Sequence, residues 1–275
     1  HYAPKKTFVN AGIGCFLNVT PDSTFKPRLP DETFQGRVTL SLDGEKVILD
    51  EAPGETPDQL YVYIPKQKAL FPGDNFYESF PNLYTLRGTP YRDPLSWIMT
   101  LQKFIDLVEM EDIHIMVPSH TRPIVGKGNI LKALQDYHDG IKFVYDQTVR
   151  LMHKGLRPNE IALALKLPHS LKNSPYLQEN YGTTEDAARM IYYGLVGWFD
   201  ANPTNLFPLD ETLFATKADK AGTNAEKADR YYKKALQRNN RELMTVSSKF
   251  CDLALLATTE NMKKAMKQNL SIAEK

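Results

Sequence analysis

The segment LYVYIPKQKALFPGDN, residues 60–75, decides how the front of the chain folds. Its first part, residues 60–64, is rich in β-branched and aromatic side chains, and a shorter run of the same kind follows at residues 69–71. Such runs, bounded by proline, glycine and polar residues, are typical of strands. The segment therefore predicts two neighbouring strands joined by a tight turn.

The sequence on either side extends this sheet. Residues 37–42 alternate between apolar and polar, Asp43-Gly44 marks a turn, and residues 46–49 resume the β-rich pattern. A helix is expected over about residues 94–110, and the apolar run 113–117 predicts a further buried strand. The front part thus combines a small sheet with one long helix.

The sequence changes character near residue 127, after which helical periodicity dominates. Helices are expected over residues 130–153, 158–165, 187–199, 226–238, 242–257 and 260–273. Two domains follow from this change: residues 1–127 of α/β type, and residues 128–275 of all-helical type. A few strands with one helix leave one face of the sheet uncovered, so a further layer is expected to cover it.

The composition excludes some classes of partner. Lysine and arginine total 34 against 33 acidic residues, a formal net charge of +1, which offers no broad field for nucleic acid or an anionic membrane. No apolar run is long enough to span a membrane, which takes about 18 residues. The chain begins with His1 rather than Met, and we therefore expect a processed, truncated or incomplete chain.

The cysteines and two asparagines bear on the compartment. Cys15 and Cys251 lie far apart among apolar neighbours, without a Cys-x-x-Cys pair, and are expected to be unpaired small hydrophobes. Asn18 and Asn269 fit the glycosylation acceptor pattern, which weakly favours a secreted or extracytoplasmic protein. The sequence does not fix the compartment further.

Three possible metal ligands follow β-rich runs of the front domain. Glu55 lies in a proline–glycine turn between two predicted strands, Asp74 directly follows a third, and His120 comes just after the apolar run 113–117. Loops at strand ends often carry functional side chains. One imidazole with two carboxylates suits zinc, manganese or iron, although acidic residues in such turns are commonly only turn formers.

Five longer stretches carry a family resemblance. They are APGETPDQLYVYIPKQKALFPGDN, FPNLYTLRGTPYRDPLSWIMTLQKFIDL, VPSHTRPIVG, YDQTVRLMHKGLRPNEIALALKLP and GLVGWFDANPTNLFPL. Over about residues 11–210 the chain resembles the alkylsulfatases of the metallo-β-lactamase superfamily, of the linear primary type. The resemblance implies the second half of an αββα sandwich, followed by an all-helical dimerisation domain.

The resemblance also implies roles for particular residues. Glu55 would complete the coordination of one zinc ion, Asp74 would bridge two, and His120 would bind the second. Arg87 would bind the sulfate head group, with Asn82 close to it. A guanidinium can bond two oxyanion oxygens at once, and a metal-bound hydroxide is a nucleophile near neutral pH. The implied reaction is hydrolysis of an alkyl sulfate ester by a two-zinc homodimer, and no residue of this chain is assigned a directly catalytic role.

The chain also departs from the family pattern. The family usually has Glu where Asp74 stands, and Glu78 and Pro81 replace family histidines. The His-x-His-x-Asp-His motif that supplies most first-half ligands is absent. We therefore expect the N-terminal half of the site on sequence outside this chain, either preceding it or on a separate cleaved chain.

Other interpretations remain open. The same departures favour a non-catalytic relative that serves as an assembly or binding module. A third interpretation places the same metal centre on a phosphate ester or a thioester. An alternative to sulfate binding pairs Arg87 with Asp93, and Arg92 is expected to pair with Asp93 or a backbone carbonyl rather than contact substrate. His114 is expected to be packed.

Overall fold

The computed structural model describes residues 24, 29–85, 88–207, 209–218 and 222–255. It divides into two compact units, His1–Gly197 and Trp198–Lys275. The boundary near residue 127 separates expected family domains rather than compact units, and it stays a prediction. Five sequence-based expectations lie outside the described residues; they concern Cys15, Asn18, Arg87, Asn269 and the helix at 260–273.

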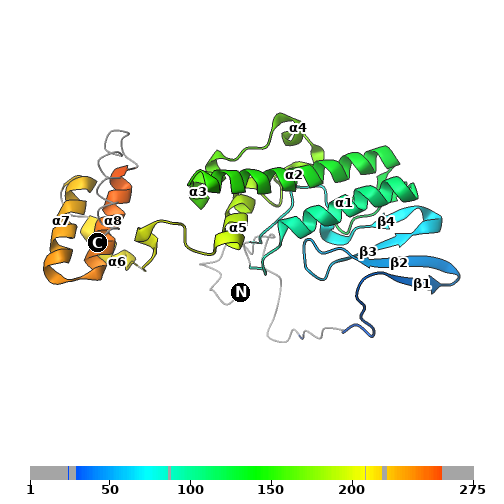
Figure 1. Cartoon of the computed structure of the whole chain (residues 1–275), viewed down its shortest axis with the longest axis horizontal. Coiled ribbons are helices and arrows are strands. Elements are labelled where there is room, and N and C mark those ends of the chain that lie inside the picture. The colour runs from blue at the N-terminus through cyan, green and yellow to red at the C-terminus, as the bar shows by residue number, and fades with distance from the viewer. Residues whose placement is uncertain (1–23, 25–28, 86–87, 208, 219–221, 256–275) are drawn as a thin grey trace. The chain divides into compact units, whose positions relative to one another are not determined.

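A six-stranded sheet forms the base of the first unit (Figure 1). Its strands are β1 (Val38–Leu42), β2 (Glu45–Glu51), β3 (Leu60–Ile64), β4 (Ala69–Phe71), β5 (Ile115–Met116) and β6 (Ile124–Val125), in that spatial order. All neighbours are antiparallel except β4 and β5, which are parallel because α1 intervenes. The sheet confirms the four strands expected before residue 72. The fifth is shorter than the run 113–117 suggested, and β6 was not expected.

In the first unit, helix α1 lies between β4 and β5 in sequence, and the other helices follow β6. The helices of this unit are α1 (Pro94–Glu111), α2 (Lys127–His153), α3 (Pro158–Ala164), α4 (His169–Lys172) and α5 (Thr184–Val196), with short 3₁₀ turns η1 (Pro65–Gln67), η2 (Gly73–Asn75) and η3 (Pro175–Leu177). The second unit contains η4 (Pro203–Asn205), α6 (Glu211–Ala218), α7 (Asn224–Arg238) and α8 (Arg241–Leu255). No described helix is both long enough and apolar enough to span a membrane.

Local capping explains where two of these helices begin. The Asp93 carboxylate accepts hydrogen bonds from the first free amides of α1, and Pro94 needs none at its position. The hydroxyl of Thr183 caps α5, which therefore begins at Thr184 and not near residue 187 as expected. The helix ends at Val196, three residues before the expected end, because Gly197 takes a positive φ of 87°.

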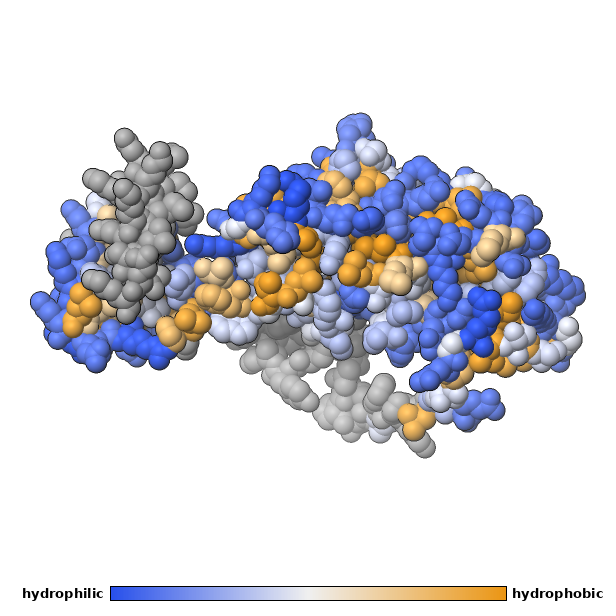
Figure 2. All heavy atoms as spheres, viewed as in Figure 1, coloured by the Kyte–Doolittle hydropathy of each residue, from blue (hydrophilic) through white to orange (hydrophobic). Residues whose placement is uncertain are grey.

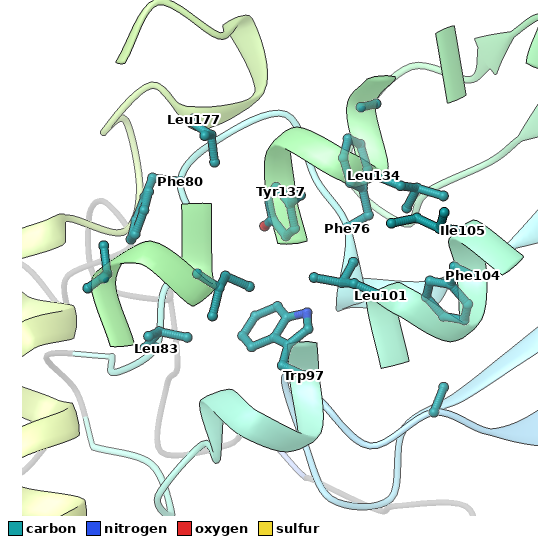
Figure 3. Close-up of a cluster of buried hydrophobic side chains, with 14 of the residues drawn as sticks. Phe76, Phe80, Leu83, Trp97, Leu101, Phe104, Ile105, Leu134, Tyr137 and Leu177 are labelled. Atoms are coloured by element: carbon teal, nitrogen blue, oxygen red, sulfur yellow. The ribbon is translucent and has the colours of Figure 1, made fainter. Parts of the chain in front are cut away.

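The main core lies between the sheet and helices α1 and α2 (Figure 3). Trp97 of α1 is fully buried, and its indole N–H donates to the carbonyl of Asn75, 2.9 Å away. Tyr61 of β3 packs its ring edge-on against Phe104, with the ring centroids 5.5 Å apart. These contacts attach α1 to the strands and to η2, so the segment that carries Asp74 is anchored to the core.

One polar cluster attaches strand β2 to α1. The buried Asp50 carboxylate of β2 accepts from Arg37 at 3.0 Å and from the Tyr61 hydroxyl at 3.2 Å, and it lies 2.9 Å from the Lys103 ammonium of α1. His114 was expected to be packed, but it is exposed beside Asp112, because β5 begins only at Ile115 and leaves His114 outside the strand. Cys251 is buried and unpaired among the described residues, as expected.

The second face of the sheet is also apolar. The strand register places Tyr61, Tyr63 and Leu70 on the face toward α1 and α2. The opposite face carries Val38, Leu40, Leu42, Val47, Leu49, Leu60, Val62, Ile64, Ala69, Phe71 and Ile115, none of which belongs to the main core. Figure 2 shows apolar residues at the surface over these strands and over α5. An antiparallel sheet with one face in water normally alternates apolar and polar residues, so this sheet is built for burial on both sides.

Candidate metal centre and substrate loop

Three loops meet at one edge of the sheet because of the strand directions. Strand β2 runs parallel to β4, since each is antiparallel to β3, and β5 is parallel to β4. The carboxyl ends of these three strands therefore lie on the same edge, and Glu55, Asp74 and His120 follow β2, β4 and β5 in turn. The topology thus places the three residues that the sequence indicated at one end of the sheet.

Glu55 is held in a buried turn by the side chain of Asn75. The Glu55 amide donates to Asn75 Oδ1 at 3.0 Å, and Asn75 Nδ2 donates to the Ala52 carbonyl at 2.6 Å. Gly54 lies against the side-chain amide of Asn75, and a Cβ on Gly54 would overlap the Asn75 oxygen. A glycine and a buried asparagine therefore fix the backbone at Glu55, a residue that is itself buried.

Asp74 and His120 form the second part of the cluster. His120 Nε2 lies 3.2 Å from Asp74 Oδ1, and the imidazole is 69% exposed. Asp74 Oδ1 is buried, and no donor in the part of the chain that the structure describes reaches it with hydrogen-bond geometry, so the imidazole beside it is its ion-pair neighbour only. A buried carboxylate oxygen with so little compensation is suited to accept a cation or a further donor.

Arg92 bonds directly to Glu55. Its Nη1 donates to Glu55 Oε1 and to the Asn82 carbonyl, both at 2.6 Å, and both charged side chains are buried. The expected pairing with a backbone carbonyl is present, but the charged partner is Glu55, because the Asp93 carboxylate caps α1 instead. Burial raises the pKa of the Glu55 carboxyl; the Arg92 charge opposes this rise and the Asp74 charge adds to it.

The described residues do not by themselves complete a metal site. No three His, Cys, Asp or Glu side chains among them are arranged to hold a metal ion. Glu55 has the expected ligand chemistry, but its carboxylate is bonded to Arg92. The orphaned oxygen of Asp74, with His120 beside it, fits one part of such a site only.

Asn82 lies on the loop of residues 79–92 that joins η2 to α1, hereafter loop 79–92. Its amide donates to the Tyr77 hydroxyl at 2.8 Å, and its carbonyl accepts from Arg92. Both backbone groups are therefore satisfied, and the buried residue is fixed relative to Glu55. Burial raises the pKa of the Tyr77 hydroxyl, with the Glu55 charge adding to it, so this phenol stays protonated. The position of Arg87 lies outside the described residues.

Comparison with known proteins gives this arrangement a context. Residues 157–274 match the family model described as alkyl sulfatase dimerisation. A linear primary-alkylsulfatase from Pseudomonas sp. (strain ATCC 19151) is 36% identical over 206 residues, which is 74% of this chain and 38% of that protein. The chain is a relative of the alkylsulfatases. It spans well under half of the length of this curated relative.

Further comparisons agree with this relationship. An alkyl/aryl-sulfatase from Saccharomyces cerevisiae is 33% identical over 65% of this chain and 28% of that protein. The solved structure of a stereoselective inverting sec-alkylsulfatase from Pseudomonas sp. has a TM-score of 0.64 at 23% identity, covering 86% of this chain and 37% of that one. The expected fold class is confirmed in its coarser form: an α/β unit with a six-stranded sheet, whose fold is similar to that of the solved sec-alkylsulfatase, followed by helices that match the alkyl sulfatase dimerisation model.

The sequence indicated Glu55, Asp74, His120 and Asn82 but missed the part played by Arg92. The only signal was an arginine before the Asp-Pro that starts α1, and nothing local points from there to Glu55, 37 residues earlier. The buried phenol of Tyr77 was missed for the same reason, since its contact with Asn82 depends on the path of the loop.

Proposed function

We propose that this chain carries the second half of an alkylsulfatase, a zinc-dependent enzyme that hydrolyses alkyl sulfate esters. Water and the ester R–O–SO₃⁻ give the alcohol R–OH and hydrogen sulfate. Glu55, Asp74 and His120 would contribute to a centre of two zinc ions, and Arg87 with Asn82 would hold the sulfate group. The similarity to alkylsulfatases supports this proposal, and the observation that carries it is the pair of Asp74 and His120, whose Oδ1 and Nε2 lie 3.2 Å apart while that oxygen accepts no hydrogen bond from the described residues.

The rest of the site would come from sequence outside this chain. The apolar second face of the sheet supports this part of the proposal, because a further sheet packed on it would bury that face. The missing layer and the missing ligands would then be the same segment, either preceding His1 or on a separate cleaved chain. The match to the dimerisation family supports a homodimer as the working assembly.

The test is sulfate release from dodecyl sulfate by the protein that includes the preceding sequence, together with its zinc content. Chelation is expected to abolish release and added zinc to restore it. His120→Gln is expected to lower zinc content and rate together, whereas His169→Gln, at an exposed position on α4, leaves both unchanged. A complete protein that binds no zinc at this cluster would refute the proposal.

A non-catalytic role is the second candidate, and the Arg92–Glu55 pair is the observation that favours it. A guanidinium already neutralises the carboxylate that a metal would need. In that case the fold would serve as an assembly or binding module. The intact mass of the native protein separates the two: a mass equal to this chain alone leaves the other ligands absent, and two-zinc catalysis fails.

A further inference from the structure

Residues 157–197, hereafter the helical region, form the part of the family match that lies in the first unit. This region contacts loop 79–92 through a backbone pairing that the proposed function does not use. Phe80 N–H donates to the Gln178 carbonyl at 2.8 Å, and Gly182 N–H donates to the Phe80 carbonyl at 3.1 Å. The Ser79 hydroxyl adds a third bond, to the same Gln178 carbonyl, at 3.0 Å. The segment 178–182, which lies inside the family match at 157–274, is therefore bonded to the residues just before Asn82.

Gly182 lies directly against the backbone of the loop. A Cβ placed on it would lie 2.5 Å from the carbonyl carbon of Pro81 and 2.7 Å from the amide nitrogen of Asn82, and it would overlap the Pro81 oxygen. Each of these atoms belongs to the backbone, which cannot rotate away as a side chain can. The φ of Gly182 is not in the positive range, so the glycine is required for space and not for its conformation.

A second glycine meets the other end of the loop. Gly194 of α5 faces the ring of Tyr91, where an added Cβ would lie 2.6 Å from the hydroxyl oxygen and closer still to the ring carbons. Tyr91 immediately precedes Arg92, which bonds to Glu55 and to Asn82. Both ends of loop 79–92 therefore rest on glycines of the helical region.

We propose that this helical region positions the substrate-binding loop, with Gly182 as a positioning residue that fixes Asn82 relative to Glu55. Three groups hold the backbone of Asn82. Gly182 packs against its backbone nitrogen, the Tyr77 hydroxyl accepts from its N–H, and Arg92 donates to its carbonyl. A region matched as a dimerisation module thus also sets the geometry of the substrate end of the site. That loop 79–92 binds substrate rests on the proposed function, but the contact by which the helical region holds the loop does not.

Hydrogen–deuterium exchange tests the coupling without any activity. Gly182→Ala is expected to speed exchange at least tenfold in peptides covering residues 79–85 and 88–92, while β2 to β4 keep their rates. Ser79→Ala, which removes only one of the three bonds, is expected to act on the same peptides more weakly. Gly128→Ala is the matched control, because nothing lies within 4 Å of its added Cβ. Unchanged exchange in loop 79–92, or an equal rise throughout α1 and α2, would overturn the inference.

Kinetics on the protein with its preceding sequence tests the consequence. Gly182→Ala is expected to raise KM for dodecyl sulfate at least tenfold, with zinc content unchanged and kcat changed much less. A fall in zinc content together with kcat would show damage to the metal ligands and contradict a positioning role. If the unmodified protein releases no sulfate, the proposed function fails, and the exchange measurement still decides whether the helical region holds the loop.

Discussion

Replacement of Arg92 by methionine is the sharpest test of how the site is held together. Methionine keeps an apolar stem of similar length but removes the guanidinium. Glu55 then loses its charged partner, and the Asn82 carbonyl loses its donor, both from bonds of 2.6 Å. Because the side chains are only 8% and 10% exposed, water cannot replace the lost interactions.

The expected loss follows from this burial. Removing one partner of a buried ion pair costs about 3–5 kcal/mol, mostly because a charge stays buried without compensation. For a unit of about 200 residues, this lowers Tm by roughly 6–20 °C. Part of the loss is expected to appear as protonation of Glu55, since burial already raises the pKa of its carboxyl.

The assay is thermal and urea unfolding at pH 7 of four proteins: unmodified, Arg92→Met, Glu55→Gln and the double variant. The double variant carries no buried charge at this pair and is expected to regain about 2 kcal/mol relative to Arg92→Met. Arg150→Met is the control, because Arg150 is exposed on α2 and donates to the uncharged Gln147 side chain. The reasoning is refuted if the free energy of unfolding of Arg92→Met lies within about 0.5 kcal/mol of that of the unmodified protein. It is also refuted if the double variant recovers no stability, because the loss would then not come from a buried charge without a partner.

Three further predictions concern the scaffold. Burial favours a higher pKa for the Asp50 carboxyl, but the hydrogen bonds from Lys103 and Arg37 outweigh it and lower the pKa below the usual 3.8. Asp50→Asn is therefore expected to lower the free energy of unfolding by about 1 kcal/mol at pH 7. In urea titrations, this difference is expected to shrink as the pH falls below 3.8. Trp97→Ala is expected to cost about 3–5 kcal/mol in the same assay, because the side chain is fully buried. Ser174→Ala is expected to lower stability by about 1.5–3 kcal/mol, since its buried hydroxyl donates to the Asp136 carboxylate at 2.7 Å.

The fold was predictable where side-chain period and turn chemistry agree. Strands β1 to β4 have a clear β-rich pattern and sharp turns, so the sequence places them within a residue or two. Strand β6 has only two residues and no period of its own; it forms because Gly126 and the residues before it return alongside β5. The start of α5 was misplaced because the sequence does not show which of several adjacent polar residues supplies the cap, and the structure gives that role to Thr183.

The site was predictable only at the level of loops. Strand-end positions indicated Glu55, Asp74 and His120. The parallel directions of β2, β4 and β5 explain why these residues lie at the same end of the sheet. Side-chain pairing was not predictable in the same way. Asp93 is the nearest partner of Arg92 along the chain, but capping α1 satisfies its carboxylate, which leaves the guanidinium for a carboxylate that only the tertiary fold brings close.

The apolar second face and the incomplete ligand set are best explained together. This sheet face carries eleven apolar side chains, all but Val47 and Ala69 at least partly exposed, and such a face would favour association unless a further layer covered it. A second sheet would pack about 10 Å from the first, and loops at its end could then reach the edge where Asp74 and His120 lie. Under the proposed function, such loops would supply a hydrogen-bond donor or a metal to the Asp74 oxygen, which accepts no hydrogen bond from the described residues and has only the His120 imidazole as its ion-pair neighbour. One further layer would then account for both features, whereas a dimer contact across the sheet face would explain only the first.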